Sequence, residues 1–198
     1  PRPPGGPPAR WLRLSREGFL GGLAWNGCAT DRFVMAPMGA NDTADLFGHL
    51  SQPEVTEYMD IDTLIDLSEA EGIVSVAQSI LNLESGVRWA IRDRGGAFVG
   101  TCGFNQIVTD RARRGEIAYD VSPAWWGQRV MDEIMPRLVD IGFRHAGLKR
   151  LEAMVTAGNT PSCRLLERHG FVWEGLLRDH AHWKGRYWDQ IVFGRVAG

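Results

Sequence analysis

Cysteine, which would mark a disulfide-bonded or zinc-binding protein, is scarce in this sequence. Only three cysteines occur among 198 residues, at positions 28, 102 and 163, and no two of them form a Cys-x-x-Cys pair. An odd, widely spaced set of this kind predicts reduced thiols in a cytoplasmic protein and gives no sign of a zinc site. We therefore expect a cytoplasmic chain whose chemistry needs no metal.

An excess of charge of one sign and a long apolar run are also missing. The 22 Lys and Arg residues nearly balance the 24 Asp and Glu residues, and the net charge is -2. This balance favours no nucleic-acid partner. No apolar run approaches the roughly 20 residues of a membrane-spanning helix, and the first ten residues, PRPPGGPPAR, lack the apolar core of a signal peptide. We expect no membrane partner.

The remaining composition is typical of one globular domain. Hydrophobic residues make up 44% of the chain and charged residues 23%, and the length suits a single sizeable core. The proline- and glycine-rich start predicts that residues 1–30 form a flexible tail, with room for an extra N-terminal hairpin. Residues 31–198 are predicted to form the single domain.

From residue 31 onward, the hydrophobic pattern predicts a strand followed by helices. Alternating apolar residues predict the strand at 31–38, and helices follow at 41–50 and 68–83. The second helix is expected to begin with a capping box that joins Ser68 to Glu71. Its predicted buried face consists of Ile73, Val76, Ala77, Ile80 and Leu81.

The second half of the chain predicts more strands than helices. Strands are expected at 88–93, 97–107, 115–121, 150–157, 171–183 and 186–196. Two helices are expected at 128–146 and 159–170, the second of them capped by Asn159 or Thr160. Elements in this order predict a mixed α/β fold, in which helices cover a central sheet.

One segment, LKRLEAMVTAGNTPSCRLLERHGFVWEGLLRD, contains several short motifs in a fixed order. A strand is followed by Asn159, by Ser162 three residues later and by a short helix, and then by Gly170-Phe171 and Glu174-Gly175. Together with HLSQPEVTEYM and the hairpin WAIRD…FVGTCGF, this order resembles the GNAT acetyltransferases. Within that superfamily it resembles the ribosomal-protein N-acetyltransferases of the Rim type, over residues 31–196.

The resemblance implies both a fold and an activity. The fold is a central mixed, largely antiparallel sheet with helices on both faces and one splayed parallel strand pair. The activity is the transfer of an acetyl group from acetyl-CoA to a primary amine, by direct attack in a ternary complex that releases coenzyme A. The expected acceptor is a small molecule or a peptide amine, and the expected enzyme is a monomer or a homodimer.

The donor site is expected between two neighbouring parallel strands. Strands at 116–121 and 151–155 would separate at their C-terminal ends, where a pantetheine arm can hydrogen-bond to strand backbone. The pyrophosphate would then meet the helix that starts near residue 128, because free N–H groups and the helix dipole favour anions. The residues predicted to bind acetyl-CoA are Val121, Trp126, Gly127, Gln128, Arg129, Val130, Met131, Asn159 and Ser162.

The loop WWGQRVM departs from the family pattern of two glycines and an alanine. Gly127 matches the first glycine, whereas Arg129 and Met131 replace the second glycine and the alanine. If position 129 needs a positive φ, arginine costs roughly 1–2 kcal/mol there, while its hydrogen bond to a phosphate returns about 1.5–3 kcal/mol. The first interpretation is a working but altered acetyl-CoA site. Alternatives are a different acyl donor, such as an acyl carrier protein or an aminoacyl group, and a non-catalytic acyl-CoA-binding module.

Transfer to an amine needs a group that accepts the amine's proton. Glu116, in the strand beside the expected thioester, is the first candidate for this base. Asp120 lies on the same face of the strand and is the reserve. The late histidines His180 and His182 are a third candidate, since imidazole titrates near neutral pH. Glu116 has an alternative role in an ion pair with one of three arginines, Arg111, Arg113 or Arg114.

Two further groups are assigned to the reacting thioester and one set to the acceptor. Ser162 is expected to donate a hydrogen bond to the departing sulfur, and a strand N–H near Val121 to polarise the carbonyl. Asp120, Trp183 and Trp188 are predicted to bind the acceptor. Such residues favour an amine that is cationic and has a flat or apolar part.

Overall fold

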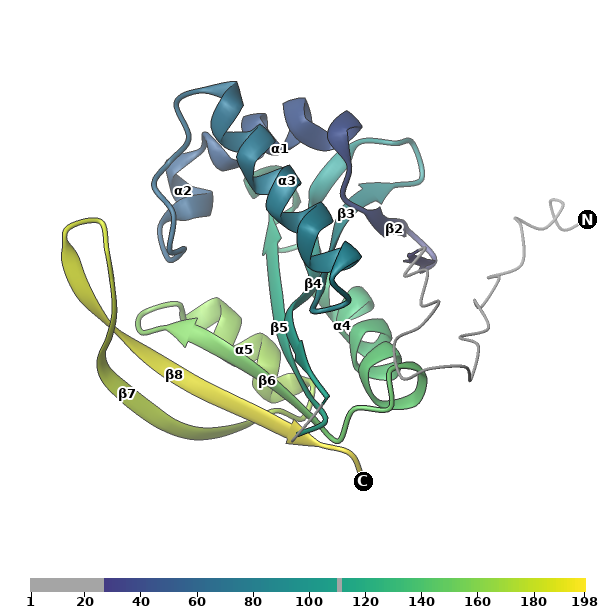
Figure 1. Cartoon of the computed structure of the whole chain (residues 1–198), viewed down its shortest axis with the longest axis vertical. Coiled ribbons are helices and arrows are strands. Elements are labelled where there is room, and N and C mark those ends of the chain that lie inside the picture. Colours follow the sequence, from purple (N-terminus) through teal and green to yellow (C-terminus); the bar gives the residue numbers. More distant parts are fainter. Residues whose placement is uncertain (1–26, 110–111) are drawn as a thin grey trace, which may run out of the picture.

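One mixed sheet forms the centre of the molecule (Figure 1). The structure is a computed structural model that describes residues 27–109 and 112–198. Within these ranges eight strands form one sheet in the order β1-β2-β3-β4-β5-β6-β8-β7. The strands are β1 (Cys28–Ala29), β2 (Phe33–Pro37), β3 (Val87–Asp93), β4 (Phe98–Val108), β5 (Arg114–Val121), β6 (Arg150–Thr156), β7 (Val172–Trp183) and β8 (Arg186–Val196). Neighbours are antiparallel except β5 and β6, so the predicted mixed, largely antiparallel sheet is confirmed.

The helices form two groups that pack into two hydrophobic cores. They are α1 (Thr43–Leu50), α2 (Pro53–Thr56), α3 (Leu67–Asn82), α4 (Val130–Asp140) and α5 (Thr160–Arg168), with a π-helical turn (Ile141–His145) after α4. Side chains of α1 and α3 share one core, and those of α4 and α5 join the larger core of the sheet. Figure 1 shows α1–α3 together, apart from α4 and α5.

Helix α4 packs on the sheet as its periodicity predicts. Val130, Ile134 and Leu138 are buried, and Ile141 at the start of the π-helical turn is half-buried against the same core. Burial of these side chains fixes the position of the helix start, where the donor site is expected.

The N-cap of helix α3 lies two residues before the predicted cap, Ser68. Asp66 is its N-cap: the Ser68 N–H donates to the Asp66 carboxylate at 2.8 Å, and the Asp66 N–H donates to Glu69 at 3.0 Å. The predicted capping box of Ser68 with Glu71 is therefore wrong. The pair Asp66 and Glu69 has the same spacing and lies two residues earlier, so the helix also starts two residues earlier.

The buried face of α3 also differs from the prediction. Ala77 is buried as predicted, and the predicted Ile73, Ile80 and Leu81 are half-buried. Ala70 and Val74 are buried in addition, whereas Val76 is 62% exposed. The predicted face had the correct helical period but was rotated, because one side of α3 covers the core and the adjacent side borders an open cavity. Ile73, Val76, Ala77 and Ile80 line that cavity.

The parallel pair of strands separates halfway along its length. β5 and β6 pair only at Arg114 with Arg150, at Gly115 with Leu151 and at Glu116 with Glu152. Beyond these positions, β5 remains paired with β4 as far as Val121, and β6 remains paired with β8 as far as Thr156. The predicted splayed pair is confirmed, with Glu116 at the point of separation.

The sheet starts slightly earlier than the predicted domain boundary. Cys28 in β1 pairs with Met35 in β2, so the ordered sheet begins before residue 31. The predicted tail falls mainly on residues 1–26, which lie outside the described residues, and the division into tail and domain remains a prediction. Among the described residues, no helix has both the length and the apolar character needed to cross a bilayer.

Candidate active site

A cavity of about 1520 Å³ opens where β5 and β6 separate. Its walls come from β5 and β6, from the loop before α4, from the first residues of α4 and α5, from the α1–α3 region and from the tip of the β7–β8 hairpin. Pockets for one ligand commonly measure about 300–1,000 Å³. The cavity therefore has room for two substrates side by side.

Most of the residues predicted for the site line this cavity. They are Glu116, Asp120, Val121, Trp126, Gly127, Arg129, Val130, Met131, Asn159, Ser162 and Trp183. Gln128 and Trp188 lie outside the lining. The Gln128 amide donates to the Ala124 carbonyl at 2.8 Å, and Trp188 stacks behind Trp183 with 5.5 Å between ring centroids. Any contact of these two side chains with substrate remains a prediction.

Arg129 has the backbone conformation that favours glycine. Its φ is 57° and its ψ is 32°, and α4 begins at the next residue, Val130. Gly127 also has a positive φ, of 72°. The N–H groups of the first turn of α4 have no intrahelical acceptor. The Arg129 side chain is exposed and forms no ion pair within the described ranges, so its charge is available to an anion.

One acidic side chain in the first turn of α4 is ion-paired. Asp132, in the first turn of α4, binds Arg168 at 3.1 Å and His169 at 3.2 Å. Burial alone would raise the pKa of Asp132, but the hydrogen bonds from Arg168 and His169 outweigh it and hold that pKa below its usual range. The helix start therefore repels a phosphate less than its sequence suggests.

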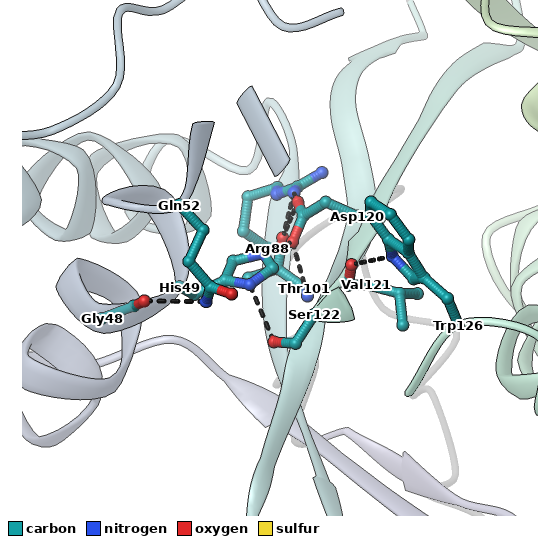
Figure 2. Close-up of polar contacts among 9 residues, drawn as sticks. All are labelled: Gly48, His49, Gln52, Arg88, Thr101, Asp120, Val121, Ser122 and Trp126. Atoms are coloured by element: carbon teal, nitrogen blue, oxygen red, sulfur yellow. Dashed lines mark hydrogen bonds and ion pairs between the residues drawn. The ribbon is translucent and has the colours of Figure 1, made fainter. Parts of the chain in front are cut away.

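The backbone of Val121 points into the gap between the separated strands. The Ser122 N–H donates to Val99 in β4 at 2.8 Å. Backbone groups alternate sides along a strand, so the N–H and C=O of Val121 point away from β4 and toward β6. The indole N–H of Trp126 donates to the Val121 carbonyl at 2.7 Å (Figure 2). The predicted polarising N–H at Val121 has a suitable direction.

A tyrosine that sequence reasoning did not single out lies against Ser162. The hydroxyls of Tyr119 and Ser162 are 2.7 Å apart, and Tyr119 lines the cavity. Burial raises the pKa of the Tyr119 phenol, so it stays protonated at neutral pH. Helix α5 is capped by Asn159, whose side chain accepts from the Ser162 N–H at 3.2 Å. Since Asn159 is the cap, the Ser162 hydroxyl is available for other chemistry.

Asp120 is held in a network of buried polar groups (Figure 2). One carboxylate oxygen lies 2.7 Å from Nε2 of His49 and accepts from the Thr101 N–H at 3.0 Å. The other accepts from Arg88 at 2.9 Å and from the Thr101 hydroxyl at 2.5 Å. Nδ1 of His49 lies 2.8 Å from the Ser122 hydroxyl. These long-range partners carry no local sequence signal.

This network fixes the charge of Asp120. Burial alone would raise the pKa of Asp120, but the hydrogen bond from His49 and the charge of Arg88 outweigh it, so the pKa lies below its usual range. Both oxygens are occupied, which leaves the carboxylate a poor proton acceptor. Ser122 lies outside the cavity lining, so the row Ser122, His49 and Asp120 does not present a nucleophile to substrate.

Glu116 has very different surroundings, although it lies on the same face of β5. It is half-buried in the cavity wall and accepts one long hydrogen bond, 3.4 Å, from Asn105. Arg114, one of its predicted alternative partners, binds Glu152 instead. Arg111 lies outside the described residues. Glu116 is therefore the carboxylate that is more open to the cavity.

The opposite end of the cavity is apolar with an acidic border. Its apolar wall comes from α1, α3 and the segment around α2, and its acidic side chains are Glu54, Glu57 and Asp60. The β7–β8 tip reaches this segment, because Lys184 donates to the Thr56 carbonyl. His180 and Trp183 line the cavity there, while His182 packs against Tyr187 instead.

Three features together are typical of an acyltransferase of the GNAT type. They are the separated strands β5 and β6, the free N–H groups at the start of α4 and the cavity that joins them. A family model described as an acetyltransferase (GNAT) domain matches residues 32–172. The chain belongs to this acetyltransferase family, as its motifs predict.

The relatives agree with this assignment. The uncharacterized N-acetyltransferase p20 of Bacillus licheniformis is 36% identical over 165 residues, which cover 83% of this chain and 92% of the relative. Among solved structures, the ribosomal L7/L12 alpha-N-protein acetyltransferase RimL has a TM-score of 0.77 at 16% identity, covering 85% of this chain and 92% of that one.

Spermidine N-acetyltransferase from Vibrio cholerae, solved with CoA and spermine, has a TM-score of 0.72 at 18% identity, covering 83% of this chain and 95% of that one. At these identities the solved structures show the fold alone. The predicted GNAT fold and the N-acetyltransferase class are confirmed by the family match and by p20.

Proposed function

We propose that this chain transfers the acetyl group of acetyl-CoA to a primary amine, by direct attack while both substrates are bound. The observation that carries the proposal is the continuity of the cavity. One cavity extends from the gap between β5 and β6, past the start of α4, to an apolar region bordered by acidic side chains. A donor and an acceptor bound in this volume would meet beside Glu116.

The donor half fits a phosphorylated thioester carrier. The gap exposes backbone groups of β5 to which a pantetheine arm can bind like an additional strand. The unsatisfied N–H groups at the start of α4 and the charge of Arg129 suit the pyrophosphate. The side chains of Asn159 and Ser162 lie on the α5 side of the same cavity.

The chemistry is divided among three groups of this chain. Glu116 accepts a proton from the ammonium of the acceptor, directly or through one water, which frees the nitrogen lone pair to attack the carbonyl carbon. The Val121 N–H stabilises charge on the carbonyl oxygen. Ser162, hydrogen-bonded to Tyr119, donates to the sulfur as its bond to carbon breaks. A thiol with a pKa of about 8.5 leaves readily, so this last contribution is modest.

The acceptor class follows from the opposite end of the cavity. The apolar wall and the carboxylates Glu54, Glu57 and Asp60 favour an amine that is cationic and carries an apolar part. RimL acts on a protein α-amine and the Vibrio enzyme on spermidine, as their names state. A small molecule and a peptide both remain candidates for this chain, as do monomer and homodimer, and a cytoplasmic location is still a prediction.

Calorimetry with acetyl-CoA tests the donor. We expect heat of binding, and protection against thermal unfolding by CoA. Absence of both would favour a donor of another kind, such as an acyl carrier protein or an aminoacyl group.

Release of free thiol over a panel of amines tests turnover. A transferase releases CoA with at least one cationic amine. A protein that binds acetyl-CoA but releases thiol with no amine would be a binding module, and the catalytic proposal would fail.

A further inference from the structure

We propose that Arg32 is a positioning residue of the donor site. It lies in the turn between β1 and β2, far in sequence from the loop before α4, and outside the cavity lining. Through backbone contacts it orients the amide groups that receive the phosphates of the donor. The link to phosphate rests on the proposed function, whereas the orientation of the loop does not.

The contacts of Arg32 converge on the start of α4. Its Nη2 donates to the Gln128 carbonyl at 3.0 Å and to the Arg129 carbonyl at 3.5 Å. Its Nε donates to Glu133 at 2.7 Å, and its own backbone N–H donates to the other Glu133 oxygen at 2.9 Å. One guanidinium therefore joins the last two carbonyls before the helix to a carboxylate in its first turn.

Because the peptide bond is planar, these contacts also fix the direction of the neighbouring N–H groups. In a trans peptide, the C=O of one residue and the N–H of the next point in opposite directions. When Arg32 holds the carbonyls of Gln128 and Arg129, the N–H groups of Arg129 and Val130 must point away from Arg32. Arg129 and Val130 line the cavity, whereas Arg32 and Gln128 do not. The two N–H groups are thus directed to the side where an anion would bind.

We call the contacts of Arg32 with the Gln128 and Arg129 carbonyls and with Glu133 the clamp. The clamp also explains how a residue other than glycine is tolerated at position 129. A left-handed arginine is strained, with a φ of 57°, so without support the loop would relax and lose this arrangement of amides. Hydrogen bonds from a charged donor such as Arg32 are about twice as strong as neutral ones. The Phe33 ring, 4.7 Å from the Arg32 guanidinium, packs edge-on against Trp125 and supports the same loop.

Amide hydrogen exchange tests the clamp without any substrate. In Arg32→Ala, we expect the amides of Gln128 and Glu133, which donate to the Trp125 and Arg129 carbonyls, to exchange about ten times faster than in the native chain, while the rest of α4 is unchanged. The matched control is Arg94→Ala, since Arg94 donates to the carbonyls of Thr30 and Asp31 in the same turn and does not touch the loop. Unchanged exchange in Arg32→Ala, equal acceleration in Arg94→Ala, or acceleration throughout α4 would each overturn the proposal.

A comparison of two donors tests the link to phosphate. Arg32→Ala should lower kcat/KM for acetyl-CoA about ten-fold, mainly through KM, and change it less than two-fold for S-acetylpantetheine, which has no phosphates. Arg32→Lys should restore part of the loss, because lysine keeps the charge but not the fork of donors.

An equal loss with both donors would overturn the role in phosphate binding. If the native chain bound no CoA while loop exchange still rose in Arg32→Ala, the proposed function would fail and the clamp on the loop would stand.

Discussion

The two carboxylates on the cavity face of β5, Asp120 and Glu116, differ in how many hydrogen-bond partners they have. Asp120 is surrounded by His49, Arg88 and Thr101, and both of its oxygens are occupied. Glu116 accepts one long hydrogen bond, from Asn105, where the strands separate. The same strand thus holds one carboxylate fixed for stability and leaves another accessible for proton transfer.

The same contrast occurs between two arginines at the donor end. The Arg32 side chain is 45% exposed but is bonded to two carbonyls and to Glu133. Arg129 has a strained backbone and an exposed side chain without an ion pair in the described part of the chain. In both comparisons the side chain with several protein partners, Asp120 or Arg32, supports the fold. The side chain with few partners, Glu116 or Arg129, is the candidate for contact with substrate.

Replacement of Asp120 should have the largest effect on the fold. In Asp120→Asn, an amide N–H would face donors, and Arg88 would lose its buried counter-ion. We expect a loss of about 3 kcal/mol in the free energy of unfolding, equivalent to roughly 6–12 °C in Tm. Thermal unfolding followed by circular dichroism measures it. Equal Tm values for the variant and the native chain would contradict the structural role.

Replacement of Glu116 should show the opposite pattern. In Glu116→Gln, Tm should stay within about 2 °C of the native value, while kcat falls about 100-fold because the proton acceptor is lost. Steady-state assays of thiol release across a pH series measure the rate. A variant with an unchanged rate at every pH would remove Glu116 as the base.

Acid unfolding sharpens the same comparison. The folded pKa of Asp120 is lowered, so its stabilising contribution is fully present above the unfolded pKa of about 3.9 and is lost as pH falls through the folded pKa. Stability of the native chain should therefore drop below about pH 4. The slope should be shallower in Asp120→Asn than in Glu116→Gln, as urea unfolding at several pH values will show. Identical slopes in the two variants would count against this assignment.

Glycine at position 129 should have the smallest effect. Arg129→Gly relieves the left-handed strain and should raise the free energy of unfolding by about 1 kcal/mol. It also removes a charge from the donor site, so the Kd for CoA should rise several-fold. Calorimetry and urea unfolding separate the two effects. Tighter CoA binding by the glycine variant would show that Arg129 obstructs the site.

The sequence predicts those features that depend on local pattern. Strand alternation, the cap at Asn159 and the family order of motifs are local, and they correctly predict the sheet, α5 and the splayed pair. The prediction of α3 failed in detail because two capping pairs with the same spacing, Asp66 with Glu69 and Ser68 with Glu71, compete for the helix start.

The polar support of the site was not predictable in the same way. His49 meets Asp120 across 71 residues, and Arg32 meets Gln128 across 96. Each of these side chains, taken alone, resembles an ordinary surface or core residue. Only the folded sheet brings them together, so sequence reasoning found the groups that line the cavity and missed those that hold the lining in place.

The separation of β5 and β6 has a kinetic consequence. Beyond Glu116, β5 pairs with β4 and β6 pairs with β8. The pantetheine arm of a donor therefore breaks no hydrogen bonds between β5 and β6 when it binds. The Trp126 indole lines this cavity, donates to the Val121 carbonyl and is 52% exposed, and exposed side chains change rotamer within nanoseconds. Donor capture should therefore be governed by diffusion, and an indole that leaves its carbonyl should report each arrival as a change in fluorescence.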